Sequence, residues 1–163
     1  AKTYTGATTV SGGVLLVNGT HAGGGDYTVA SDATLGGSGT ITLAGGKTLD
    51  AGGAVSPGDP GIAGGVGTLT ASGPTSLGGD FRFDIDGAES DLLRVTGEVS
   101  LSGGLQLNVI ADPTAGTITV IENTGSSNTT SGAFNNYADG ALVEIGERAA
   151  EKAMPAIQEM LKG

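Results

Sequence analysis

Short runs of alternating apolar and polar residues recur along the first 145 positions of the chain. Residues 40–43 (Thr-Ile-Thr-Leu), 81–85 (Phe-Arg-Phe-Asp-Ile) and 105–109 (Leu-Gln-Leu-Asn-Val) each place apolar side chains on one face. A period of two residues is typical of a half-buried β-strand. Further alternating or continuously apolar runs occur at residues 8–10, 14–17, 27–29, 68–70, 92–95, 99–101 and 117–121. The pattern therefore predicts an all-β fold.

Glycine pairs separate these runs. They stand at residues 12–13, 36–37, 45–46, 52–53, 64–65, 78–79 and 103–104, with a triplet at 23–25. Because glycine adopts positive φ angles without steric penalty, the pairs predict tight corners between short strands.

Two all-β architectures accommodate short strands with frequent corners. An antiparallel sandwich favours Asn-Gly or Asp-Gly hairpin turns, and only residues 18–19, 86–87 and 139–140 provide them. In a solenoid, each turn of the chain stacks on the previous one. We favour a parallel β-helix, whose residues 1–145 would form roughly seven rungs of about 20 residues each.

Two segments interrupt this rhythm. Residues 56–61 (Ser-Pro-Gly-Asp-Pro-Gly) read as a double turn that bulges from the rod together with residues 62–65. Residues 124–130 are polar and predict a surface loop.

From residue 147 onward the pattern changes to that of an amphipathic helix. Its apolar face would consist of Ala150, Ala153, Met154, Ile157 and Leu161. Pro155 is expected to kink this helix. The helix could cap the last rung, mediate binding to a partner or self-association, or be an appended tail. The expected domains are thus a parallel β-helix over residues 1–146 and a helix over residues 147–163.

Composition narrows the possible partners. The chain of 163 residues has a formal net charge of −10, which argues against nucleic-acid binding and against an anionic membrane surface. Only 4% of residues are aromatic, so the core must be built from small aliphatic side chains. Cysteine is absent, no run reaches transmembrane length, and residues 1–3 do not begin a signal peptide. We expect no membrane insertion by this segment.

The densest set of carboxylates is Asp84, Asp86, Glu89 and Asp91. Calcium prefers several oxygen ligands gathered by one loop, which makes this set a weak Ca²⁺ candidate. The spacing fails the EF-hand pattern, and the calcium-binding nonapeptide repeat is absent as an array. A solvated acidic turn is the favoured interpretation.

Catalytic chemistry has little support in the sequence. His21 is the only histidine, and one histidine without cysteine cannot form a zinc site or a catalytic triad alone. We expect it to be exposed and structural. Parallel β-helices also include polysaccharide lyases and hydrolases, but Tyr4, Tyr27 and Tyr137 are scattered in the sequence and basic residues are few. We predict no catalytic residue, no enzyme activity and no cofactor.

Residues 4–19, with the sequence YTGATTVSGGVLLVNG, resemble the autotransporter-associated β-strand repeat, also called the passenger-associated transport repeat. Similar segments follow in the usual order at residues 35–41, 54–58, 67–70, 90–97 and 101–105. The resemblance implies a right-handed parallel β-helix in a bacterial surface or secreted passenger region, where the repeat is mostly a stalk or scaffold. The helical tail departs from the family pattern, in which further β sequence would follow.

The sequence therefore predicts a non-enzymatic stalk or scaffold module of an autotransporter-like passenger, located outside the cell or on the bacterial surface. The alternative is an adhesin-type module that recognises a glycan or a host protein along one β face. An exposed ladder of aromatic or Asn/Thr side chains would favour that alternative.

Overall fold

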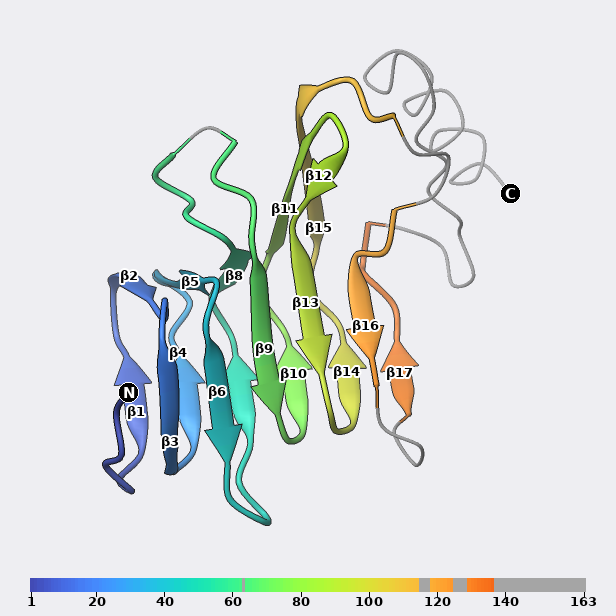
Figure 1. The fold of residues 1–163 in the computed structure, drawn as a ribbon. Helices are drawn as coiled ribbons and strands as arrows, with labels where there is room; N and C mark the ends of the chain where they lie inside the picture. The colour runs from blue at the N-terminus through green and yellow to red at the C-terminus, as the bar shows by residue number, and fades with distance from the viewer. Residues whose placement is uncertain (63, 115–117, 125–128, 137–163) are drawn as a thin grey trace.

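A computed structural model describes residues 1–62, 64–114, 118–124 and 129–136 of the protein. In this part of the chain, short strands wind into a parallel β-solenoid with three sheets (Figure 1). The prediction of an all-β parallel β-helix is confirmed at this level. The predicted helix over residues 147–163, and with it the division into two domains, lies outside the described residues.

Each turn of the coil contributes one strand to each sheet. The first sheet contains, in spatial order, β1 (Thr8–Val10), β4 (Tyr27–Val29), β7 (Leu49–Ala51), β10 (Thr75–Leu77), β14 (Val99–Leu101) and β17 (Thr130–Gly132). The second sheet contains β2 (Gly13–Leu16), β5 (Ala33–Gly37), β8 (Ala54–Pro57) and β11 (Phe81–Asp86), with β12 (Glu89–Ser90) and β15 (Leu105–Ala111) both paired to β11. The third sheet contains β3 (Thr20–Gly24), β6 (Thr40–Leu43), β9 (Thr68–Ser72), β13 (Leu92–Val95) and β16 (Ile121–Asn123).

The described chain makes about four regular turns, from β1 to β13, and β14 to β17 continue the stack. Thr8 pairs with Tyr27, Tyr27 with Leu49 and Leu49 with Thr75, so successive turns take 19, 22 and 26 residues. The predicted number of seven rungs is not confirmed. The right-handed sense of the coil also stays a prediction.

The parallel register of the first sheet explains why apolar and polar residues alternate in such short strands. In β4, β7 and β10 of the first sheet, the two outer residues are buried and the central residue is more exposed. Tyr27, Leu49, Thr75 and Val99 are consecutive in one inward ladder, and all four are buried. Each fully buried Leu or Phe side chain contributes about 1.5–3 kcal/mol relative to its exposed state.

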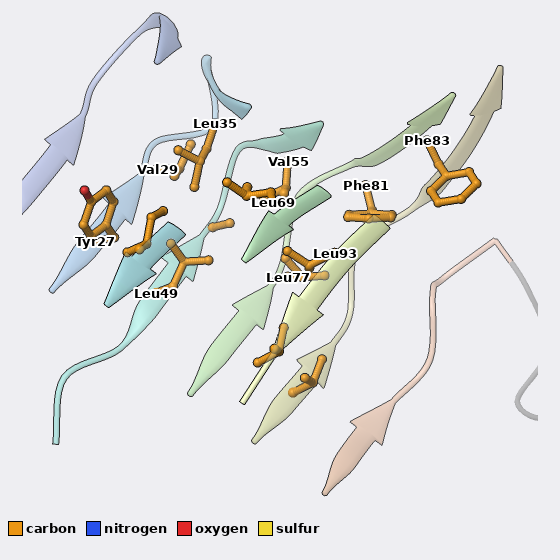
Figure 2. Close-up of a cluster of buried hydrophobic side chains, with 14 of the residues drawn as sticks. Tyr27, Val29, Leu35, Leu49, Val55, Leu69, Leu77, Phe81, Phe83 and Leu93 are labelled. Atoms are coloured by element: carbon orange, nitrogen blue, oxygen red, sulfur yellow. The ribbon is translucent and has the colours of Figure 1, made fainter. Parts of the chain in front are cut away.

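The ladders of the three sheets meet in one narrow core, where labelled side chains from facing strands point toward one another (Figure 2). In the second sheet the inward ladder runs through Leu35, Val55, Phe81 and Leu105. Phe81 stacks on Phe134 with ring centroids 6.0 Å apart. The core is mainly aliphatic, as predicted, and its buried aromatic side chains in the described residues are Tyr27 of β4 and Phe81 and Phe83 of β11.

At the corner between the first and second sheets, glycine is required for close backbone packing rather than for the positive φ angle that was predicted. Gly53, Gly79 and Gly103 do not have positive φ angles. A Cβ atom on Gly79 would collide with the backbone carbonyl of Gly53, and one on Gly103 with that of Gly79. We call these three residues the glycine column. They are required because successive turns of backbone approach each other closely there. Gly37, with a φ of 108°, matches the original expectation.

Two short segments pair with strand edges near the ends of the described coil. At the N-terminal end, the backbone of Lys2 pairs with β3, donating to the Thr20 carbonyl at 2.7 Å and accepting from the Ala22 N–H at 2.8 Å. Near the other end, the Asn136 carboxamide bonds both backbone groups of Leu105, at 2.8 and 2.7 Å. A side-chain amide thus takes the place of a neighbouring strand on β15.

Three local predictions change in detail. Ser56 and Pro57 belong to β8, so the bulge begins at Gly58 rather than at residue 56. The strand expected at residues 117–121 lies instead at β16, because Ile121 alone among the described residues 118–121 joins the third sheet. The loop predicted at residues 124–130 is described only at its ends, where Thr130 already belongs to β17. No helix within the described ranges is long and apolar enough to cross a membrane.

Candidate surface groove beside the insertion loop

Insertions into the coil gather at one corner, between the second and third sheets. The insertion loop (residues 58–67, described apart from Ala63) joins β8 to β9. One turn later, β11 continues into an antiparallel hairpin with β12. The seven-residue β15 follows β11 along this projection (Figure 1). Chain that extends beyond the regular turns is therefore concentrated on one side of the molecule.

A buried carboxylate holds this corner together. Asp91 is only 1% exposed. It accepts hydrogen bonds from the backbone N–H of Gly67 at 2.8 Å and from that of Asp84 at 2.9 Å. Its own N–H donates to the Asp84 carbonyl at 2.9 Å. Asp91 therefore ties the base of the insertion loop to β11.

The pKa of Asp91 reflects its burial. Desolvation raises the pKa of this carboxyl to about 6, and the two backbone N–H bonds oppose that rise. The charge on Asp91 is thus partly compensated by the chain around it.

The predicted calcium ligands lie in different environments. Asp84 and Asp86 are on the outer face of β11, Glu89 pairs with Asp86 across the hairpin, and Asp91 is buried beneath. Asp84 already accepts a 3.0 Å hydrogen bond from the Asn108 Nδ2. In the described part of the chain, no group of three or more His, Cys, Asp or Glu side chains is placed to hold a metal ion. The calcium hypothesis gains no support and stays a prediction.

A polar groove of about 410 Å³ lies between the insertion loop and the outer face of the second sheet. Its floor is formed by Arg82 and Asp84 of β11 with Gln106 and Asn108 of β15. These side chains are neighbours because Arg82 pairs with Gln106 and Asp84 with Asn108 in the parallel register. The wall opposite is residues 60–62 of the insertion loop. We call this site the outer groove.

Sequence reasoning missed most of the outer groove. Of its floor residues, only Asp84 was singled out, and for calcium. The signal that could have found the others is the pair of alternating runs at 81–86 and 105–109, which carry polar residues at matching positions. Only the register shows that these runs are adjacent.

His21 was predicted to be exposed, and this is wrong. It is 2% exposed, because residues 20–24 form β3 and its register places His21 opposite the buried Ile41. Its Nε2 donates to the Tyr4 carbonyl at 3.2 Å, and the Tyr27 hydroxyl donates to its Nδ1. Burial raises the pKa of Tyr27 to about 12. Tyr4 and Tyr27 are scattered in sequence but both contact His21. Tyr137 lies outside the described residues.

The outer face of the first sheet offers a second surface. Its outward ladder of small polar side chains consists of Thr9, Thr28, Asp50, Ser76, Ser100 and Ser131. Part of it borders a hollow of about 370 Å³. None of these six residues is aromatic or Asn, so the ladder matches only in part the type expected of a binding face.

The fold defines the class of this protein as a parallel β-solenoid repeat protein. Comparison with known proteins adds no family: no family model, no curated protein and no solved structure gives a significant match to the chain.

Proposed function

We propose that this chain is a non-enzymatic structural module, a stalk or scaffold segment of an autotransporter-like passenger that is secreted or held on the bacterial surface. The observation that carries the proposal is the repeated inward ladder, in which each turn fills the same positions as its neighbours. A core of this kind makes stability a property of stacked turns rather than of one centre. The resemblance of residues 4–19 to the autotransporter repeat supports the same function.

Surface display tests the scaffold proposal. The chain would be placed between a bacterial surface anchor and an epitope tag, and protease-resistant display of the tag measured on intact cells. We expect display to be lost in Leu35→Asp, because the substitution buries a charge in the ladder. The matched control Thr28→Asp places the same charge on the exposed face and should be displayed normally. Equal display of both variants would contradict the proposal.

A partner role for the predicted helix over residues 147–163 remains part of this proposal. Self-association through that helix predicts that the chain is oligomeric in light-scattering measurements and becomes monomeric when residues 147–163 are removed. If the truncated chain forms particles with the same number of copies as the full chain, the helix does not mediate self-association.

The second candidate function is a binding module that recognises a glycan or a host protein along one β face. The outer groove favours it, because the insertion loop and the polar floor contribute little to the core yet form a shaped surface. Wild-type chain that binds no glycan or protein ligand through this face would contradict it.

A further inference from the structure

We propose that the outer groove binds an uncharged oligosaccharide, with Arg82, Asp84, Gln106 and Asn108 as a hydrogen-bonding floor and the insertion loop as an apolar wall. The inference rests on the second candidate function and names its site and ligand class. The scaffold proposal does not depend on it.

The floor is a regular array of four polar side chains. Neighbouring strands lie about 4.8 Å apart, and alternate residues along a strand lie about 7 Å apart. Arg82 and Gln106 form one pair across the strands, and Asp84 and Asn108 form the other. These spacings spread four polar side chains over one continuous surface, which can contact several hydroxyl groups at once.

The floor side chains are held in place before any ligand arrives. Asn108 donates through Nδ2 to Asp84 Oδ1 at 3.0 Å, and Gln106 donates through Nε2 to Asp80 Oδ2 at 2.7 Å. These bonds use the amide nitrogens, which leaves the amide oxygens of both residues available as acceptors. Fixing side chains in advance lowers the entropy lost on binding.

Arg82 supplies the donors. Its side chain is exposed and makes no hydrogen bond or ion pair within the described residues, so its N–H groups are available. A sugar hydroxyl both donates and accepts, and it therefore suits a floor that combines guanidinium donors with carboxylate and amide acceptors.

The wall supplies the apolar contact that the C–H face of a sugar requires. Pro60 and Ile62 line the groove, and Ile62 is 59% exposed. An exposed isoleucine on an inserted loop has no role in the core, whereas here it faces the polar floor across the groove.

The charges around Arg82 select against anionic ligands. Asp84 lies in β11 and Asp80 immediately before it. Asp32 and Asp80 line a second hollow of about 410 Å³ that also includes Arg82. Three carboxylates around one guanidinium repel a uronate or a phosphate. The second hollow extends the site beyond Arg82, which gives room for more than one sugar unit.

An added β-strand fits the groove poorly. Strand addition needs a free sheet edge, whereas the floor is the face of β11 and β15. β11 is paired with β8 at Phe81 and with β12 at Ile85 and Asp86 on one side, and with β15 on the other. At the outer edge of β15, the Asn136 side chain occupies both backbone groups of Leu105. Side chains, rather than backbone groups, are what this surface offers a ligand.

The test uses the ¹⁵N-labelled full chain, with the side-chain amide signals of Gln106 and Asn108 as reporters. The probes are neutral tetrasaccharides of glucose, mannose and galactose, with tetragalacturonate as the charged counterpart. We expect at least one neutral probe to shift both signals at millimolar concentration, and tetragalacturonate to bind at least about tenfold more weakly. If no neutral probe shifts them, or if tetragalacturonate binds as tightly, the proposal is overturned.

Variants locate the site. Arg82→Ala and Asp84→Ala should each weaken the affinity about tenfold or more, because each removes a charge-assisted hydrogen bond. Ser100→Ala, on the outer face of the first sheet, is the matched control and should bind normally. Affinity unchanged in Arg82→Ala, or lost in Ser100→Ala, would place binding elsewhere. Because Arg82 is exposed, Arg82→Ala should still be displayed on the cell surface in the assay described above. Loss of oligosaccharide binding with normal display would therefore be a defect of the groove and not of the scaffold.

Discussion

Two corners of the same coil behave in opposite ways. Between the first and second sheets, the connections are two or three residues long in every turn, from residues 11–12 to residues 102–104. Between the second and third sheets, the connection grows from residues 38–39 to the insertion loop at 58–67. The first corner packs its backbone against the previous turn through the glycine column, whereas the second projects away from the core. The second corner also touches the previous turn at Gly37 and Gly39, where an added Cβ would collide with the Val17 and Gly19 carbonyls. Its later turns nevertheless carry inserted chain, whereas the first corner stays short throughout.

The largest effect should come from adding a side chain to the glycine column. Gly79→Val places atoms against the Gly53 carbonyl, so the turns must separate, and we expect a loss of about 3 kcal/mol or more in the free energy of unfolding. Denaturant melts measure it. Gly45→Ala is the control, since its new Cβ meets nothing within 4 Å and should change stability little. A stable Gly79→Val variant would show that the short corner is not closely packed.

The next effect is the dependence of stability on pH through Asp91. Its folded pKa of about 6 lies above the ordinary value of 3.8, so the folded state binds the proton more tightly. The stability contributed by this group is therefore full below about pH 4 and is lost as pH rises to about 6. The loss amounts to at most about 3 kcal/mol.

Chemical denaturation at several pH values measures this dependence. Asp91→Asn should flatten the slope between pH 4 and 6 whatever its absolute stability, whereas the control Asp86→Asn should keep it. A wild-type slope of the opposite sign, rising with pH and absent in Asp91→Asn, would contradict the raised pKa.

Shortening the insertion loop should have a smaller effect. The Asp59 N–H already bonds the Gly65 carbonyl at 2.7 Å, so residues 60–64 can be removed and these ends joined. We expect a change of less than about 1 kcal/mol in unfolding free energy, because loop length alone costs little. The same deletion removes the apolar wall and should weaken oligosaccharide binding. Global unfolding of the shortened chain would show that this corner is as constrained as the other.

Calcium should have the smallest effect. The four candidate carboxylates are divided between an outer face, a hairpin and a buried position, so we expect added Ca²⁺ to leave the melting temperature nearly unchanged. A rise of several degrees that disappears in Asp84→Asn would restore the calcium site.

Residue patterns predicted the architecture because apolar alternation and glycine pairs report local geometry directly. They could not predict which strands become neighbours, since successive turns vary from 19 to 31 residues in the first sheet. For that reason Arg82, Gln106 and Asn108 were not recognised as one surface. His21 was misplaced for a related reason: the glycines after it suggest a corner, yet it lies in β3. The glycine column could not be predicted from the sequence either, because each of its glycines is required by contact with the backbone of the previous turn.

The pairing of Lys2 with β3 and of Asn136 with β15 affects self-association of the protein at high concentration. A stack of parallel turns is a template on which further copies could deposit, as in the growth of a fibril. Each of these short segments occupies backbone groups that an incoming copy would need. One backbone segment near the N-terminal end and one amide side chain near the other end of the described coil thus partly block end-to-end polymerisation.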